Sequence, residues 1–318
     1  MAVSRRDLRA LLGKVEQELA RPAAAAASAA ILPFKRERGR PDIAFENLTA
    51  TLEEETGILW AEMHHLERAC FTRPLMRDGR EFQLYLKRLY QGASPEEMPF
   101  RYLAWVSRAK GAWSLGGDLS VFTALIRAQD REGLRAYAHL SIDVLHDNYC
   151  GLELPIITAA VIEGDAVGGG FEAMLTNDFV VAERGAKFGL PEILFNLFPG
   201  MGAYSFLRRR VGEVEARRLI EDGRTRSADE LHQLGLVDIV CEKGEGRDRL
   251  REHVRANPRR FRTELALRRM RNRVEPVTKS ELVDIVELWV DLALTLEEQD
   301  LRRMDCLARH QQRRRAAA

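Results

Sequence analysis

AVIEGDAVGGGFEAMLTNDFVVAERGAKFGLPEILFNLFPGMG, residues 160–202, is the stretch of sequence that decides the fold. An apolar, strand-like run at residues 156–162 leads into the glycine triplet 168–170, and an apolar helix-like run follows from Phe171. The triplet is therefore expected where a strand gives way to a helix N-terminus. Backbone N–H groups at a helix start lack an intrahelical acceptor and carry partial positive charge, so this junction predicts an oxyanion-binding site.

Two carboxylates accompany this junction. Glu172 falls in the first turn of the expected helix, and Glu192 follows after a second apolar strand, residues 179–182, and a turn at residues 189–191. This is enough chain for Glu192 to fold back and face Glu172. Taken singly, each residue has a structural explanation, since acidic residues match the helix dipole and Pro-Glu often starts a helix. Together, beside N–H donors, they predict acid–base catalysis.

Composition limits the classes of protein to consider. With 318 residues, 46% hydrophobic and 31% charged, the chain can form one large domain or two smaller ones. No apolar run approaches the roughly 18 residues of a membrane span, and the N-terminus lacks the apolar segment of a secretory signal, so we expect a cytoplasmic protein. We expect neither a metal site nor a cofactor, because the cysteines are scattered without ligand spacing: Cys70, Cys150, Cys241 and Cys306.

The order of the expected elements divides the chain into three parts. Residues 1–40 form a helical, alanine-rich appendage, residues 41–245 an α/β core, and residues 246–318 a helical C-terminal region. No internal repeat is visible at a fixed period. Besides the central stretch, the expected elements of the core are a hairpin at 48–65, a helix at 74–90, a strand at 101–107, helices at 120–127 and 134–149, a helix after 202, a capped helix from Ser227 and a strand at 234–242.

Arginine is concentrated in the C-terminal part. The net charge is only +1, yet residues 247–273 hold eleven arginines and residues 313–315 three more. Two explanations remain open: a solvated helix face, or a docking surface for an acidic partner. Nucleic-acid binding is not expected, because no helix-turn-helix, zinc-finger or stacking-aromatic pattern accompanies the charge.

The combination of motifs resembles the crotonase (enoyl-CoA hydratase/isomerase) superfamily. The resemblance implies an α/β fold with a ββα superhelix core and an all-helical C-terminal region, assembled as a trimer or hexamer. It rests on five features in order: glycine pairs or triplets at 116–117 and 168–170, Pro-Glu at 191–192, PGMG at 199–202 and Gly-Leu-Val-Asp at 235–238.

The resemblance also implies roles for individual residues. Gly117 and Gly169 match the two positions whose amides form the oxyanion hole of the superfamily. Glu172 and Glu192 match its paired acid–base glutamates, and the sequence leaves open which is acid and which is base. The substrate-binding residues that we expect around this pair are Phe171, Leu194, Phe195, Met201 and Trp289, although Trp289 is equally well explained as a core residue.

A narrower resemblance points to the RpfF-type synthases of diffusible signal factors, which are bacterial cis-2-unsaturated fatty-acid messengers. It implies dehydration of a 3-hydroxyacyl thioester of acyl carrier protein to a cis-2-enoyl thioester, followed by hydrolysis to the free acid. Acyl carrier protein would be the acidic partner, and a regulatory receiver domain can be a second. The motifs are RACFT (68–72), WSLGGDLSVF (113–122), GLPEILFNLFPGMGAYSF (189–206) and ELWVDLALTLEEQDLRRMD (287–305).

Two other functions remain open. One is a conventional enoyl-CoA hydratase or isomerase, although MHHLERACFTRP, residues 63–74, replaces the loop that coenzyme A-using crotonases usually carry there. The other is a catalytically idle crotonase fold that acts as a binding module, against which the presence of both Glu172 and Glu192 argues. The apolar segment 193–198 is expected to desolvate the glutamates, raise a pKa and line an acyl tunnel.

Overall fold

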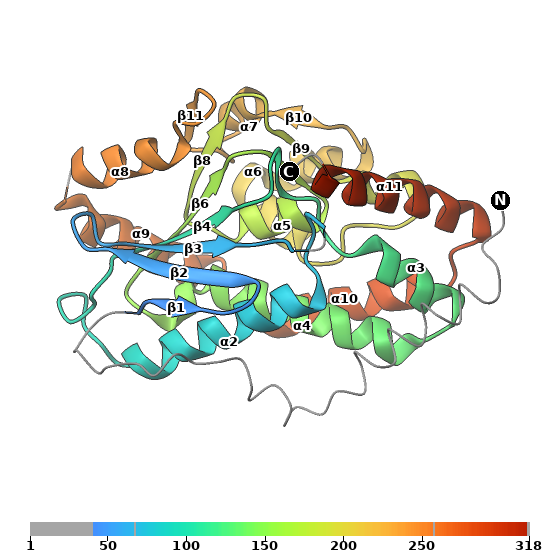
Figure 1. Cartoon of the computed structure of the whole chain (residues 1–318), viewed down its shortest axis with the longest axis horizontal. Coiled ribbons are helices and arrows are strands. Elements are labelled where there is room, and N and C mark those ends of the chain that lie inside the picture. Colours follow the sequence, from blue (N-terminus) through green and yellow to red (C-terminus); the bar gives the residue numbers. More distant parts are fainter. Residues whose placement is uncertain (1–40, 67, 257, 317–318) are drawn as a thin grey trace.

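The computed structural model describes residues 41–66, 68–256 and 258–316, so the expected N-terminal appendage lies outside the described residues (Figure 1). Its larger sheet has seven strands in the order β1-β2-β3-β4-β6-β8-β11. The first three strands pair antiparallel, which confirms the predicted hairpin, and the remaining pairs are parallel. The strands are β1 (Ile43–Ala44), β2 (Leu48–Glu53), β3 (Ile58–Met63), β4 (Tyr102–Ser107), β6 (Ile157–Ile162), β8 (Phe179–Glu183) and β11 (Ile239–Cys241).

A smaller sheet of four short strands lies next to the first, in the order β10-β9-β7-β5. Its pairs are parallel except for β10 with β9. The strands are β5 (Ala112–Ser114), β7 (Asp165–Val167), β9 (Lys187–Gly189) and β10 (Arg226–Ser227).

Three consecutive units have the same course: a strand of the larger sheet, a strand of the smaller sheet and then a helical segment. They are β4-β5-α3, β6-β7-α5 and β8-β9-η3, with α3 at Leu119–Arg127, α5 at Gly169–Leu175 and the 3₁₀ helix η3 at Pro191–Phe195. Parallel pairing stacks each unit on the one before, which gives the expected ββα superhelix. The three units repeat in structure, although the sequence shows no repeat at a fixed period.

The glycine triplet therefore follows a different strand from the expected one. We predicted that residues 156–162 lead directly into the triplet, but the three-residue strand β7 intervenes and carries the chain from the larger sheet to the smaller one. A helix does begin at Gly169, as predicted, with Gly168 as its N-cap. The triplet thus lies where the smaller sheet meets α5.

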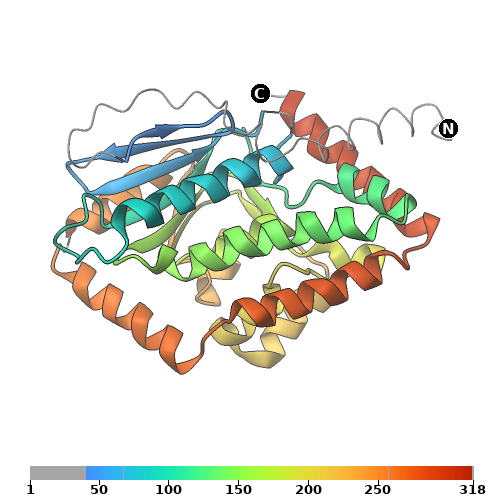
Figure 2. The same ribbon diagram turned by 90° about the horizontal axis from the view of Figure 1, so that it is seen from below.

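Helices cover both faces of the larger sheet, because neighbouring residues of its strands point to opposite sides. In β4, Leu103 and Trp105 pack toward α2 and α4, whereas Tyr102 and Ala104 pack toward α8 and α9. On the first side, α2, α4 and α10 lie side by side (Figure 2). The helices are α2 (Arg73–Tyr90), α4 (Arg131–Tyr149), α6 (Ala203–Glu221), α7 (Ala228–Gln233), α8 (Gly246–Ala256), α9 (Arg260–Val274), α10 (Lys279–Ala293) and α11 (Glu298–Ala316), with a short 3₁₀ helix η2 at Gly151–Glu153.

Several local predictions are confirmed. The predicted helix at 74–90 is α2, and the capped helix entry at Ser227 is a capping box in which Ser227 and Glu230 bond each other's backbone amide. In the part of the chain that the structure describes, no helix combines the length and the apolar character that crossing a membrane requires.

Candidate active site

The amides of Gly117 and Gly169 lie close together between two stacked units. A Cβ atom placed on Gly169 would lie 3.4 Å from the nitrogen of Gly117. Among the described residues, neither amide has a hydrogen-bond acceptor. Two neighbouring N–H groups that are left free in this way form a site for an oxyanion.

Gly116 makes this approach possible. Its φ is +86°, which residues with a side chain rarely adopt, and a Cβ there would lie 2.8 Å from both Gly169 N and Val167 O. The carbonyl of Gly116 accepts a hydrogen bond of 2.7 Å from Phe71 N. Because carbonyl and amide point in opposite directions within a trans peptide unit, this bond turns the N–H of Gly117 away from Phe71.

Glu172 is the buried carboxylate of the site. It lies in the first turn of α5, is 1% exposed, and its Oε1 accepts hydrogen bonds from Met201 N (2.8 Å) and Ala203 N (3.0 Å) at the start of α6. Burial raises the pKa of Glu172 to about 7, although the two N–H donors oppose this. One oxygen of the carboxylate is thus fixed in position.

Glu192 lies in the first turn of η3, and its side chain extends toward Gly168. A Cβ placed on Gly168 would lie 2.8 Å from Oε1 of Glu192, so the carboxyl group reaches over the glycine triplet. Its Oε2 is buried and has no hydrogen-bond partner among the described residues. Burial, and then the charge of Glu172, raises the pKa of Glu192 to about 8. The two carboxyl groups therefore differ in their hydrogen bonding, since Glu172 accepts from two backbone amides and Oε2 of Glu192 from no described donor.

One cavity of about 50 Å³, which we call the chamber, brings the predicted residues together. Gly117, Gly169, Glu172 and Glu192 all line it. Its other walls come from four different segments and include Leu119, Phe122, Phe195, Met201, Trp289 and Met304.

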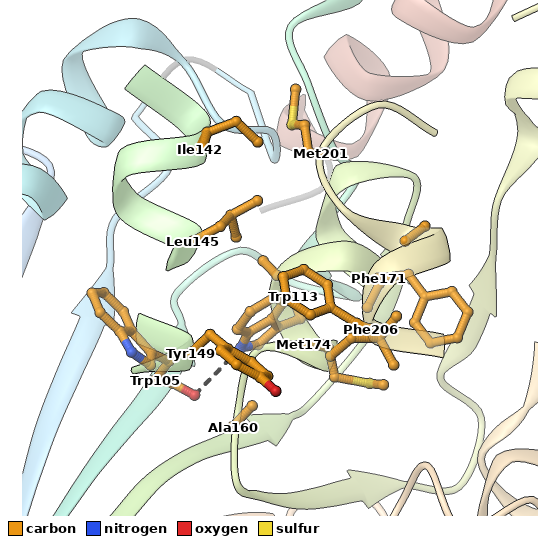
Figure 3. Packing of buried hydrophobic residues seen from close by; sticks show 14 of the residues in the cluster. Trp105, Trp113, Ile142, Leu145, Tyr149, Ala160, Phe171, Met174, Met201 and Phe206 are labelled. Carbon is orange, nitrogen blue, oxygen red and sulfur yellow. Dashed lines mark hydrogen bonds between the residues drawn. The ribbon is translucent and has the colours of Figure 1, made fainter. Parts of the chain in front are cut away.

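A second cavity, of about 60 Å³ and almost wholly apolar, shares Gly169 and Met201 with the chamber. We call it the apolar cavity. Its walls come from the strands β2 to β5, from the helices α2, α4 and α5, and from adjoining segments. They include Leu75, Met76, Trp105, Trp113, Leu145 and Ala173, and Figure 3 shows Trp105, Trp113, Leu145 and Met201 in the surrounding core.

Of the five predicted substrate-binding residues, three line the chamber and two do not. Phe195, Met201 and Trp289 line the chamber. Phe171 is buried but packs against Phe188, with ring centroids 6.0 Å apart, and lines neither cavity.

Leu194 lies outside the pocket as well. It is 53% exposed, because the tight turn of η3 directs Ile193 and Leu194 to the surface, whereas Glu192 and Phe195 line the chamber. Of the segment 193–198 that we expected to line an acyl tunnel, these two residues line neither cavity. The apolar wall comes instead from α2 and α4.

Much of the arginine-rich stretch is not a free docking surface. Arg268 is 7% exposed and donates to the carbonyls of Ile156 (2.6 Å) and Leu154 (2.9 Å), and Arg271 pairs with Asp178 (2.7 Å). These contacts hold α9 against the core, so docking through Arg268 is excluded. Further pairs with acidic residues are Arg247–Glu163, Arg251–Glu53, Arg255–Glu55, Arg260–Glu264 and Arg262–Glu96, and the side chains of 313–315 lie outside the described residues.

Three residues that support the site were missed by the sequence analysis or assigned no specific role. His65 is buried, and its ring nitrogens face the carbonyls of Cys70 (3.2 Å) and Trp113 (3.0 Å). The Tyr137 hydroxyl accepts from Asp118 N at 3.1 Å. Gln311 reaches the same loop from α11. No sequence pattern marked any of the three.

Comparisons with known proteins agree with this geometry. The profile of a family described as enoyl-CoA hydratase/isomerase matches residues 107–306, well over half of the chain. A probable enoyl-CoA hydratase of Rhizobium meliloti is 37% identical over 135 residues, which are 42% of this chain and 52% of that protein. The chain spans about half, or less, of the length of the curated relatives it matches.

Solved structures match over more of the chain. Enoyl-CoA hydratase from Bacillus halodurans superposes with a TM-score of 0.67 at 21% identity, over 82% of this chain and 99% of that one. Pseudomonas aeruginosa DspI superposes with a TM-score of 0.58 at 26% identity, over 78% and 95%. The folds agree, and the matched profile covers both glutamates and both glycines of the chamber. The chain therefore belongs to the enoyl-CoA hydratase/isomerase family.

Proposed function

We propose that this protein dehydrates a 3-hydroxyacyl thioester to a cis-2-enoyl thioester and then hydrolyses the thioester to the free acid, in the manner of the diffusible-signal-factor synthases. One observation supports this best. Two free amides and two glutamates whose pKa values are both raised line one chamber, which shares its wall with an apolar cavity.

In the first step, a carboxylate removes a proton from C2 of the acyl group and a carboxylic acid protonates the C3 hydroxyl, which leaves as water. Negative charge develops on the thioester oxygen, and the amides of Gly117 and Gly169 stabilise it. By analogy with deletion of single oxyanion-hole donors, each amide contributes about 3–4 kcal/mol to the transition state.

The environments of the two glutamates assign their roles. Oε2 of Glu192 is buried without a hydrogen-bond donor among the described residues, and the charge of Glu172 adds to burial in raising its pKa, so we assign Glu192 as the acid that delivers a proton to the leaving hydroxyl. Oε1 of Glu172 accepts hydrogen bonds from two backbone amides, which favour the charged form, so we assign Glu172 as the base.

The second step uses the same groups. A glutamate activates a water molecule, which attacks the thioester carbonyl, and the same amide pair holds the tetrahedral oxyanion. Collapse of this intermediate breaks the carbon–sulfur bond, and the thiolate leaves with a proton from the carboxylic acid. The acyl chain would lie in the apolar cavity, which excludes bulk water from its length.

The identity of the acyl carrier is a separate part of the proposal. We propose acyl carrier protein because of the resemblance to the synthases, not because of the arginine-rich stretch, much of which is paired with acidic residues. The alternative is a conventional enoyl-CoA hydratase, which the similarity to the probable enoyl-CoA hydratase of Rhizobium meliloti favours.

A product assay distinguishes these readings. The purified full chain is mixed with 3-hydroxydodecanoyl acyl carrier protein or with its coenzyme A analogue, and free 2-enoic acid is measured by mass spectrometry. We expect free acid from the carrier-protein substrate, its loss in Glu192→Gln, and no change in Glu46→Gln, whose side chain is exposed. Turnover of the coenzyme A ester alone, without hydrolysis, would establish the hydratase instead, and no turnover of either would leave a binding module.

A further inference from the structure

We propose that Gln311, on α11, is a positioning residue that holds the loop carrying the first oxyanion-hole amide. The loop comprises residues 115–118 and follows β5. This inference rests on the proposed oxyanion role of Gly117, and it assigns a catalytic task to a helix that supplies neither glutamate.

The contacts of Gln311 fix its orientation. Its Nε2 donates to the carbonyl oxygens of Leu115 and Gly117, each at 2.9 Å, and the side chain is 3% exposed. Both N–H bonds of the amide are thereby used. A flipped amide would point its oxygen at two carbonyl oxygens, so only the orientation with nitrogen toward the loop is compatible with these neighbours.

These two bonds hold the peptide units on either side of the one that carries the N–H of Gly117. The carbonyl of Leu115 belongs to the unit before Gly116, and the carbonyl of Gly117 to the unit that leads into Asp118. The unit between them, which carries the N–H of Gly117, is held through the Gly116 carbonyl by Phe71 N. Gln311 and Phe71 together therefore fix three consecutive peptide units.

The remaining amides of the loop are also bound. Leu115 N donates to the carbonyl of Ala69 at 2.6 Å, Gly116 N to the hydroxyl of Ser114 at 3.3 Å, and Asp118 N to the hydroxyl of Tyr137 at 3.1 Å. Within the described residues, the N–H of Gly117 is thus the donor of this loop that is left for a substrate. An arrangement of this kind costs no reorganisation when charge develops during the reaction.

Other contacts hold α11 in place independently of Gln311. Arg127 of α3 pairs with Asp305 (2.8 Å) and Glu298 (3.1 Å), and Asn196 donates to Asp300 at 2.8 Å. Met304, the residue before Asp305, lines the chamber. Figure 1 shows α11 running beside α3. A change at Gln311 therefore leaves the helix docked and removes only its hold on the loop.

Loss of the two donors has a defined local effect. Among the residues that the structure describes, the carbonyls of Leu115 and Gly117 have no donor other than Gln311, and buried carbonyls that lose their donor rotate toward a new donor or water. Such a rotation would move the intervening amide of Gly117 away from its position beside Gly169. The charge that develops in the transition state is then held less well, whereas binding of the acyl chain in the apolar cavity is unaffected.

Three variants test the proposal in the full-length protein. Gln311→Met keeps the shape and removes both donors, Gln311→Lys keeps donors at a similar reach, and His310→Ala changes the exposed neighbour on the same helix. We measure kcat and KM with the thioester that the wild type turns over. For Gln311→Met we expect kcat to fall about 10- to 100-fold, somewhat less than deletion of an oxyanion donor, with KM within about twofold. Gln311→Lys should recover most of kcat, and His310→Ala should match the wild type.

Hydrogen exchange of the peptide containing residues 115–118 is a second readout that does not require turnover. We expect exchange to accelerate there in Gln311→Met, and not in Gln311→Lys or His310→Ala. If the wild type turns over neither thioester, the proposed function fails, and this exchange pattern alone decides whether Gln311 holds the loop. Unchanged exchange and kcat in Gln311→Met would overturn the inference. So would accelerated exchange along the whole of α11 with no recovery in Gln311→Lys, because that describes a merely structural residue.

Discussion

Replacing Glu192 by glutamine should remove activity and, at alkaline pH, make the protein more stable. The carboxyl group is buried against Gly168, and its Oε2 has no partner among the described residues. Above its pKa the carboxyl group is negatively charged, no described positive side chain pairs with it, and the negative charge of Glu172 repels it. Glutamine keeps the shape without the charge. The residue that we propose as the acid therefore destabilises the fold above its pKa.

The sign and size of the effect follow from the pKa. Because the pKa of Glu192 rises from 4.5 to about 8 on folding, its contribution to stability is complete below 4.5 and is lost as the pH rises through about 8. A difference of about 3.5 corresponds to about 5 kcal/mol as an upper bound, at about 1.4 kcal/mol for each pKa unit. Since Glu192 is only partly buried as a residue, we expect roughly 2 kcal/mol, or about 5 °C in melting temperature.

Urea unfolding of the wild type and of Glu192→Gln at pH 5 and pH 9 measures this. We expect nearly equal stability at pH 5 and a more stable variant at pH 9, with at least a 100-fold loss of dehydration at both. Glu46→Gln serves as the matched control, because its side chain is exposed, and it should show no pH-dependent difference. A variant that gains nothing at pH 9, or gains equally at both pH values, would refute the reasoning.

Three further predictions concern the scaffold. Gly170→Ala would place a Cβ 2.1 Å from the Ser114 carbonyl oxygen, so we expect a loss of about 3 kcal/mol or insoluble protein, measured by thermal unfolding. Arg268→Met leaves two buried carbonyls without donors and should cost about 3 kcal/mol, whereas Arg269→Met, at an exposed neighbour, should change stability little in the same assay. Ser227→Ala removes a helix cap and should lower the free energy of unfolding by about 1 kcal/mol without changing kcat.

Features that depend on local chemistry could be predicted from the sequence. The hairpin at 48–65, the cap at Ser227 and the helix start at the glycine triplet each follow from residues within a few positions of one another. The approach of Gly117 to Gly169 was available only through resemblance to known proteins, because these residues belong to different units of the superhelix.

Features that depend on packing could not be predicted. The strand β7 is three residues long, too short for a periodic pattern, so its place in a second sheet was invisible. Leu194 is as apolar as Phe195, and only the geometry of the turn places one outside and the other inside. Arg268 lies in a basic run that is typical of a solvated helix face, yet its side chain is buried and donates to the carbonyls of Leu154 and Ile156.

Gln311 and Leu115, which share a hydrogen bond, lie 196 residues apart in the sequence. This separation affects when, during synthesis of the chain, the bond can form. The ribosome adds roughly 5–20 residues each second, so the 142 residues from Gly169 to Gln311 take roughly 7 to 28 s to synthesise. During that interval a nascent chain can stack its ββα units and bring the amides of Gly117 and Gly169 together. At that stage Phe71 already holds the peptide unit of Gly117, but Gln311 does not yet hold the two units beside it. Assembly of the core can therefore precede completion of the proposed active site, which requires the residues at the C-terminal end of α11.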